Sequence, residues 1–141
     1  MNPKTQQMTQ AEKQAEKDEL KAITLNFFSS IYNTHKTSLG NIPWADLKPN
    51  EHLLEHLHYT VGHRGRAIVI GCGLGDDAKA LEDAGYEVTA FDIAPEAIKL
   101  ARERFIDTNI SFHVGDIFKL ETEWLEAFDF VFEAFTIQSL P

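Results

Sequence analysis

An apolar run that leads directly into a glycine-rich turn constrains the fold of this chain more than any other feature. The run is Arg66–Ile70, and the turn that follows carries Gly71, Gly73 and Gly75. Glycine lets a backbone turn sharply and approach a ligand closely, because no Cβ intrudes. A helix is predicted to follow from Asp76 to Ala84. The sequence therefore predicts a strand, a tight turn and a helix in direct succession.

Strands and helices alternate through the rest of the chain. We predict strands at Glu87–Phe91, Ile110–Val114 and Phe128–Phe132, and a helix that begins near Pro95. This alternation predicts an α/β, Rossmann-like fold, a parallel sheet with helices on both faces. Right-handed crossovers place the second strand beside the first, the third outside it, and the fourth on the other side of the first. That order creates a crevice at the carboxyl ends of the strands, where open α/β sheets bind ligands.

The chain has 141 residues, the size of one domain, and we divide it into three parts. Residues 1–10 are predicted to be a disordered tail, residues 11–59 to form N-terminal helices and a cap loop, and residues 60–141 to form the ligand-binding part. The middle part includes a short helix predicted at Glu51–Tyr59. It also carries an apolar stripe at helical spacing, which we interpret as a face packed in the core. The stripe contains Leu20, Ile23, Phe27, Phe28, Ile31 and Tyr32.

Composition narrows the class of partner. The formal net charge is -9 at pH 7, and no basic block is present, which disfavours a nucleic-acid partner. No apolar run approaches the roughly 20 residues that span a bilayer, and the N-terminus has no apolar signal-peptide core. Cys72 is the only cysteine, so no intrachain disulfide is expected. We therefore expect a cytoplasmic protein that binds neither membrane nor nucleic acid.

The glycine spacing and the nearby acids narrow the class of ligand. The dinucleotide fingerprint is Gly-x-Gly-x-x-Gly, whereas position 76 here is Asp. Asp76 and Asp77 at the start of the helix would repel a pyrophosphate, but they suit a ligand with an ammonium and a sulfonium. Asp92, at the end of the second strand, can accept hydrogen bonds from ribose hydroxyls or can cap the next helix. These features favour S-adenosyl-L-methionine over a nicotinamide cofactor.

Two further acids follow the third and fourth strands. Asp116 can accept a hydrogen bond from an adenine amino group with Ile117 against the ring, or it can simply form the turn. Glu133, or the carbonyls around it, can hold the ammonium of the ligand, with solvent exposure as the alternative. His52 and His56 share a helix face, but the glutamate and third ligand of a zinc protease are missing. We predict no metal site and identify no catalytic residue.

Three segments resemble the first three motifs of the class I S-adenosylmethionine-dependent methyltransferases. They are Val69–Gly75, Phe91–Ile98 and Gly115–Phe118. More narrowly, Ile42–Pro49 and Phe128–Phe135 are similar to segments of the thiopurine S-methyltransferase-like group. That group includes thiol, halide and other small-nucleophile methyltransferases. The resemblance therefore implies methyl transfer from S-adenosyl-L-methionine to a small-molecule methyl acceptor.

The same resemblance implies which residues contact the cofactor. A tryptophan from the cap loop packs over it, the glycine turn contacts its methionine part, and the acid after the second strand binds the ribose. The segment after the third strand contacts the adenine, and the main chain after the fourth lines the point of methyl transfer. The implied cofactor-binding residues are Trp44, Gly71, Cys72, Gly73, Asp92, Ile93, Asp116, Ile117, Glu133 and Ala134.

The resemblance extends from about Asn33 to Pro141 and departs from the family at the C-terminus. Domains of this class usually have seven strands, whereas four are predicted here, so we expect the C-terminal strands to be missing. The fourth strand would then be a sheet edge, with Phe128, Phe130 and Phe132 nearby. A long apolar edge invites pairing with another chain. The alternative to an enzyme is thus a truncated cofactor-binding module without turnover, which forms a homodimer through this edge.

Overall fold

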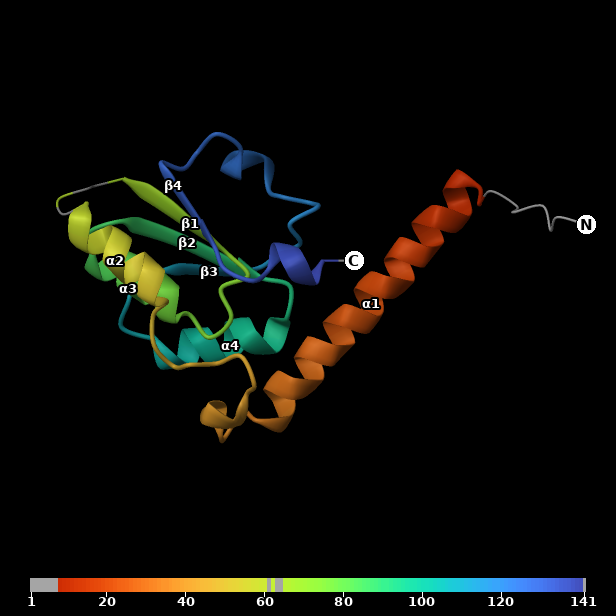
Figure 1. The fold of residues 1–141 in the computed structure, drawn as a ribbon, viewed down its shortest axis with the longest axis horizontal. Helices are drawn as coiled ribbons and strands as arrows, with labels where there is room; N and C mark the ends of the chain where they lie inside the picture. Colours follow the sequence, from red (N-terminus) through yellow and green to blue (C-terminus); the bar gives the residue numbers. More distant parts are fainter. Residues whose placement is uncertain (1–7, 61, 63–64, 141) are drawn as a thin grey trace, which may run out of the picture.

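The computed structural model describes residues 8–60, 62 and 65–140. Within them, one parallel sheet has the strand order β3-β2-β1-β4 (Figure 1). The predicted order and direction of the strands are therefore confirmed. The strands are β1 (Arg66–Ile70), β2 (Glu87–Asp92), β3 (Ser111–Val114) and β4 (Phe130–Glu133).

The α-helices that follow the first two strands pack on one face of the sheet. They are α3 (Asp76–Asp83) and α4 (Pro95–Arg104), and α2 (Glu51–Tyr59) packs beside α3 (Figure 1). Successive right-handed crossovers that move in one direction along a sheet place their helices on the same face. The opposite face carries the 3₁₀ turn η2 (Thr122–Trp124), whose Trp124 ring stacks on Phe91 with 5.4 Å between centroids.

The core lies between the sheet and these helices. Alternate residues of the strands point toward the helices, so Val69 and Ala90 are buried against Leu81 and Ile98. Gly75 begins α3 with a φ of 92°, and a Cβ there would lie 3.0 Å from the Phe112 ring. A glycine at this position therefore lets α3 start close against the sheet.

The N-terminal helix α1 (Gln10–Thr34) begins with a capping box. The Thr9 hydroxyl accepts a hydrogen bond from the Glu12 N–H at 3.2 Å, and the Glu12 carboxylate accepts one from the Thr9 N–H at 2.7 Å. The helix therefore starts at Gln10, which is the last residue of the segment predicted to be a disordered tail. Residues 1–7 of that prediction lie outside the described residues.

The core interpretation of the apolar stripe on α1 is wrong for its N-terminal half. Leu20 is 43% exposed, and Ile23 and Phe27 are each 57% exposed, whereas Tyr32 is 3% exposed. The first turns of the helix extend away from the sheet (Figure 1), and these three side chains stay largely exposed, although the Phe27 ring lies 6.4 Å from the Trp44 ring between centroids. Periodicity identifies an apolar face, but it does not reveal where along a helix the domain ends.

The remaining boundaries differ little from the predictions. The helix at Glu51–Tyr59 and the strand at Arg66–Ile70 are confirmed residue for residue. The strand β4 begins two residues later than predicted, at Phe130; the residue before it, Asp129, accepts a hydrogen bond from the Arg66 N–H through its carboxylate at 2.9 Å. Two 3₁₀ turns, η1 (Leu39–Asn41) and η3 (Ile137–Ser139), complete the described elements. None of the described helices is both long enough and apolar enough to cross a bilayer.

Candidate functional site

A cavity of about 460 Å³ lies at the carboxyl ends of the strands. This volume is in the range that holds small molecules and cofactors, and the position is the switch point between β1 and β4. Its walls come from α1, the loop before α2, the turns after β1, β2 and β3, and the segment after β4. The predicted site residues that line it are Trp44, Gly71, Cys72, Gly73, Asp92, Ile93, Asp116, Ile117 and Ala134.

The floor of the cavity is the glycine turn after β1. Gly71 and Gly73 have φ values of 64° and 52°, in the left-handed region that favours glycine. A Cβ on Gly71 would overlap the Thr136 hydroxyl. The Cys72 N–H donates to the Phe91 carbonyl at 3.0 Å, which ties the turn to the end of β2. The turn therefore has a fixed shape that brings bare backbone to the cavity.

Asp92 connects the turn after β1 with the turn after β2. One carboxylate oxygen accepts from the Gly73 N–H at 3.0 Å, and the other accepts from the Ala94 N–H at 2.9 Å. Burial raises the pKa of Asp92, and these backbone hydrogen bonds partly oppose that rise. An ionised carboxylate has about four acceptor positions, so both oxygens can accept further bonds. The local-turn role and the ligand role considered for Asp92 are therefore compatible.

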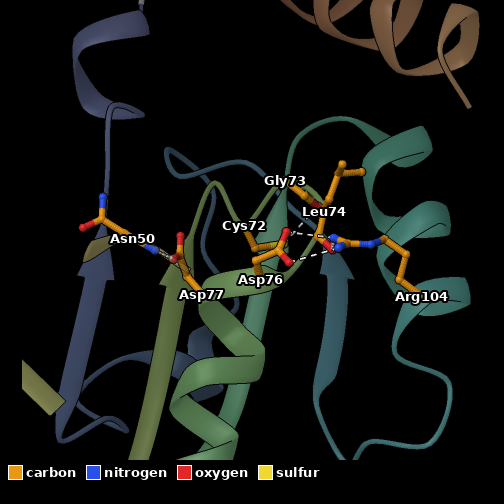
Figure 2. A network of polar contacts seen from close by, with 7 residues as sticks. All are labelled: Asn50, Cys72, Gly73, Leu74, Asp76, Asp77 and Arg104. Atoms are coloured by element: carbon orange, nitrogen blue, oxygen red, sulfur yellow. Dashed lines mark hydrogen bonds and ion pairs between the residues drawn. The ribbon is translucent and has the colours of Figure 1, made fainter. Parts of the chain in front are cut away.

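The two acids at the start of α3 have different partners (Figure 2). Arg104 donates to Asp76 through both of its terminal nitrogens, at 2.8 and 3.0 Å, and also to the Leu74 carbonyl at 2.8 Å. Asp77 accepts a hydrogen bond from the Asn50 N–H at 2.7 Å, and burial raises the pKa of its carboxyl. Arg104 thus offsets the charge of Asp76, whereas the sequence interpretation assigns that charge to a cationic ligand.

Trp44 is joined to α1 by a partly buried hydrogen bond. Its Nε1 donates to the Tyr32 hydroxyl at 2.9 Å. Its ring also meets Phe28 and Tyr32 edge to face, with centroids 5.1 and 5.5 Å apart. Tyr32 and Phe28 line the cavity, but sequence reasoning assigned them only to a packed stripe. Their spacing on α1 was the available signal, and it does not distinguish a core face from a cavity wall.

Lys21 reaches the cavity from α1 and contacts the turn after β3. Its Nζ lies 3.4 Å from a carboxylate oxygen of Asp116 and 4.7 Å from the centroid of the Phe118 ring. Asp116 also accepts a hydrogen bond from the Phe118 N–H at 2.9 Å, as expected of a turn-forming Asp. Sequence reasoning missed Lys21, because nothing in the sequence distinguishes it from the other lysines of α1.

Glu133 is the one predicted site residue whose side chain the structure does not bring to the cavity. Its carboxylate accepts hydrogen bonds from the N–H groups of Thr136 at 2.7 Å and Ile137 at 3.0 Å. The neighbouring Ala134 does line the cavity. The Glu133 side chain therefore stabilises the turn that follows β4.

The Cys72 thiol and the histidines of α2 offer no reactive group to this site. Burial, followed by the nearby charge of Asp92, raises the pKa of Cys72, so its thiol stays protonated. His56 stacks on Phe130, with 5.2 Å between ring centroids. In the part of the chain that the structure describes, no three His, Cys, Asp or Glu side chains are grouped as metal ligands.

The charge of the cavity wall is predominantly negative. Arg104 offsets the charge of Asp76, and Lys21 lies beside Asp116, which leaves more carboxylates than cations. Such a wall disfavours a pyrophosphate and favours a cationic ligand. The charged residues that line the cavity are Asp46, Asp76, Asp77, Asp92, Asp116, Lys21 and Lys48.

The chain matches known proteins over the same region. The family model for a methyltransferase domain matches residues 67–141. A malonyl-[acyl-carrier protein] O-methyltransferase from Acetivibrio thermocellus is 36% identical over 88 residues, which are 61% of this chain and 30% of that protein. The solved structure for the conversion of a disulfide bond into a thioacetal group during echinomycin biosynthesis has a TM-score of 0.67. It is 30% identical to this chain, and the match covers 79% of this chain and 47% of the chain in that structure.

A further solved structure shares the fold at low identity. Magnesium protoporphyrin IX methyltransferase from Synechocystis PCC 6803 with bound S-adenosylmethionine has a TM-score of 0.65 at 17% identity. The match covers 86% of this chain and 64% of the chain of that methyltransferase. The chain thus spans less than two thirds of the length of each of these proteins. The chain belongs to the methyltransferase domain family, and its fold is that of the class I S-adenosylmethionine-dependent methyltransferases.

Proposed function

We propose that the cavity binds S-adenosyl-L-methionine, and that the protein transfers its methyl group to a small-molecule nucleophile. The observation that carries this proposal is the meeting of the bare Gly71–Gly73 turn with the Asp92 carboxylate in one cavity. The predominantly acidic wall supports a cationic sulfonium cofactor over a pyrophosphate-containing one. The family match over residues 67–141 supports the same class of reaction.

The residues present fit this cofactor. Asp92 has free acceptor capacity for ribose hydroxyls, and the left-handed turn presents backbone without side chains to the methionine part. Ile117 and Asp116 line the cavity beyond β3, where the adenine is expected. Trp44 and Phe28 supply apolar surface for the remaining wall.

Methyl transfer from this cofactor requires little from the protein beyond positioning the two reactants and excluding water. When bound, the cofactor supplies a methyl group on a sulfonium, which is already a good leaving group. The aromatic wall of Phe28 and Trp44 limits access of water, and the turn fixes where the ligand lies. Burial keeps Tyr32 and Cys72 protonated, so neither serves as a general base at neutral pH. An acceptor that arrives as an anion needs no such base.

The acceptor class remains the finer part of the proposal. The similarity of Ile42–Pro49 to the thiopurine S-methyltransferase-like group favours a small thiol or halide. The relative from Acetivibrio thermocellus is an O-methyltransferase, which favours an oxygen acceptor as the second candidate. Methyl-transfer assays on small thiols, iodide and short acyl carboxylates separate these candidates. Turnover on thiols or iodide supports the first, and turnover on carboxylates alone overturns it.

Calorimetric titration tests the cofactor. We expect S-adenosyl-L-methionine to bind with an enthalpy signal and a single site, and NAD to give no binding at the same concentration. Binding of NAD alone overturns the proposal and restores a nicotinamide-dependent reaction. Binding of S-adenosyl-L-methionine without turnover on any acceptor favours a binding module instead of an enzyme.

We also propose that β4 can pair with a second copy of the chain. Within the described residues β4 pairs only with β1, and its Val131 is 58% exposed. An unpaired apolar edge is a template for strand pairing. Sedimentation of the chain is expected to show a dimer, and Val131→Lys, which puts a charge on that edge, is expected to shift it to monomer. A wild-type monomer at all concentrations contradicts this part of the proposal.

A further inference from the structure

The Tyr32 hydroxyl is a buried donor that the described protein leaves unused. Tyr32 is 3% exposed, and its oxygen accepts the hydrogen bond from Trp44 Nε1 at 2.9 Å. Among residues 8–60, 62 and 65–140, no acceptor is found for the O–H proton of Tyr32. A buried hydroxyl without an acceptor costs free energy, so this proton is expected to have a partner in the working protein.

The position of this hydroxyl is directly above the glycine turn. Its oxygen lies 3.3 Å from the place that a Cβ on Gly73 would occupy, and Tyr32 lines the cavity. The Trp44 hydrogen bond fixes the oxygen in this place. The hydroxyl is therefore directed at the part of the cavity next to Gly73.

The hydroxyl also remains a donor at physiological pH. Burial, and then the nearby charge of Asp92, raises the pKa of Tyr32 well above its ordinary value. The partner of the Tyr32 hydroxyl must therefore be a hydrogen-bond acceptor. A negatively charged oxygen accepts a stronger hydrogen bond than a neutral one.

We propose that the Tyr32 hydroxyl donates a hydrogen bond to a carboxylate at the amino-acid end of the ligand in this cavity. This inference rests on the proposed function, which places the methionine part at the glycine turn. Asp92 is an acceptor and suits the ribose hydroxyls, whereas Asp116 lies beyond β3. The carboxylate is the group of the cofactor that most needs a donor near Asp92, because the wall there is acidic. Tyr32 thereby selects a ligand that carries this carboxylate.

The test compares two ligands on matched variants of the full chain. S-adenosyl-L-methionine and its decarboxylated analogue share the adenosine, the sulfonium and the ammonium, and only the first has the carboxylate. We expect the wild-type chain to bind S-adenosyl-L-methionine more tightly, and Tyr32→Phe to reduce that preference about ten-fold or more. Tyr59→Phe, at a tyrosine that is 79% exposed, is expected to leave the preference unchanged.

A second variant separates the proton donor from the Trp44 contact. Trp44→Phe removes the Nε1 donor but keeps the Tyr32 hydroxyl, so it is expected to retain a preference for the carboxylate ligand. If Tyr32→Phe keeps the wild-type preference, or weakens both ligands equally, the Tyr32 assignment is overturned while the proposed function stands. If the wild-type chain binds neither compound, the proposed function is overturned together with this inference.

Discussion

The carboxylate of Asp92 accepts a hydrogen bond from the backbone N–H of Gly73 at 3.0 Å. The acid at the end of β2 thus fixes the turn at the end of β1, and the two motifs recognised separately in the sequence form one structural unit. The same carboxylate accepts from the Ala94 N–H at 2.9 Å. Loss of this single side chain is therefore expected to affect both the shape of the site and the ligand it holds.

The variant Asp92→Asn removes the charge and one of two acceptor oxygens. Because ribose hydroxyls would lose a charged acceptor, the affinity for S-adenosyl-L-methionine is expected to fall roughly ten- to a hundred-fold. The free energy of unfolding is expected to fall by only about 1 kcal/mol, since one backbone N–H loses its partner. Calorimetry and urea denaturation measure the two effects. The control is Asp83→Asn, at a carboxylate that is 62% exposed on α3, and equal binding by Asp92→Asn would refute the ribose assignment.

The variant Gly71→Ala tests the backbone requirement of the turn. Its φ of 64° costs an alanine about 1–2 kcal/mol, and its Cβ would overlap the Thr136 hydroxyl. We expect the free energy of unfolding to fall by about 2 kcal/mol or more, with loss of cofactor binding. The matched control is Gly40→Ala, whose Cβ would meet nothing within 4 Å, so its unfolding free energy is expected to change by less than about 0.5 kcal/mol. Similar behaviour of the two variants would count against a strained turn.

The variant Arg104→Lys tests the contact between α4 and the start of α3. Arginine holds Asp76 through two nitrogens and the Leu74 carbonyl as well, and a lysine ammonium cannot reproduce this geometry. Urea denaturation is expected to show a loss of about 1–2 kcal/mol. A double-mutant cycle with Asp76→Asn is expected to show clear coupling. Additive effects in that cycle would mean that the pair contributes nothing specific.

The variant Asp77→Asn tests the cost of a buried charge. Burial raises the pKa of Asp77 in the folded chain, so the stabilisation from its protonated form is complete at low pH and is lost as pH rises through the folded value. Asparagine keeps an acceptor for the Asn50 N–H but cannot ionise. The stability of the variant relative to wild type is therefore expected to increase from about pH 4 to about pH 7. A constant difference across that range, measured by urea denaturation, would contradict the shift.

Much of the fold could be predicted because short patterns in the sequence specify the individual helices, strands and turns. The apolar run at Arg66–Ile70, the glycines after it and Pro95 at the start of α4 each specify a short segment, and crossover handedness then orders the strands. The glycine turn and Asp92 could be predicted for the same reason, since both lie at the ends of recognisable strands. Local signals of this kind survive folding, because the neighbouring residues determine them.

The parts that could not be predicted depend on contacts between distant segments. Lys21 and Asp116 are separated by most of the chain, and they meet at 3.4 Å only in the folded protein, where α1 packs beside α4. The periodicity of α1 also gave no indication that Ile23 would be exposed while Tyr32 would be buried. Glu133 follows a strand as a site acid would, but two backbone N–H groups of the next turn bind its carboxylate.

The most direct test of this account is a crystal structure of the chain with S-adenosylhomocysteine, the demethylated form of the cofactor. We expect density in the cavity at the carboxyl ends of β1 and β2, with ribose hydroxyls on the Asp92 carboxylate and the amino-acid end at Gly73. Density at another surface, or a ligand in the cavity with its ribose away from Asp92, would contradict the assignment of this cavity and of Asp92 to the cofactor.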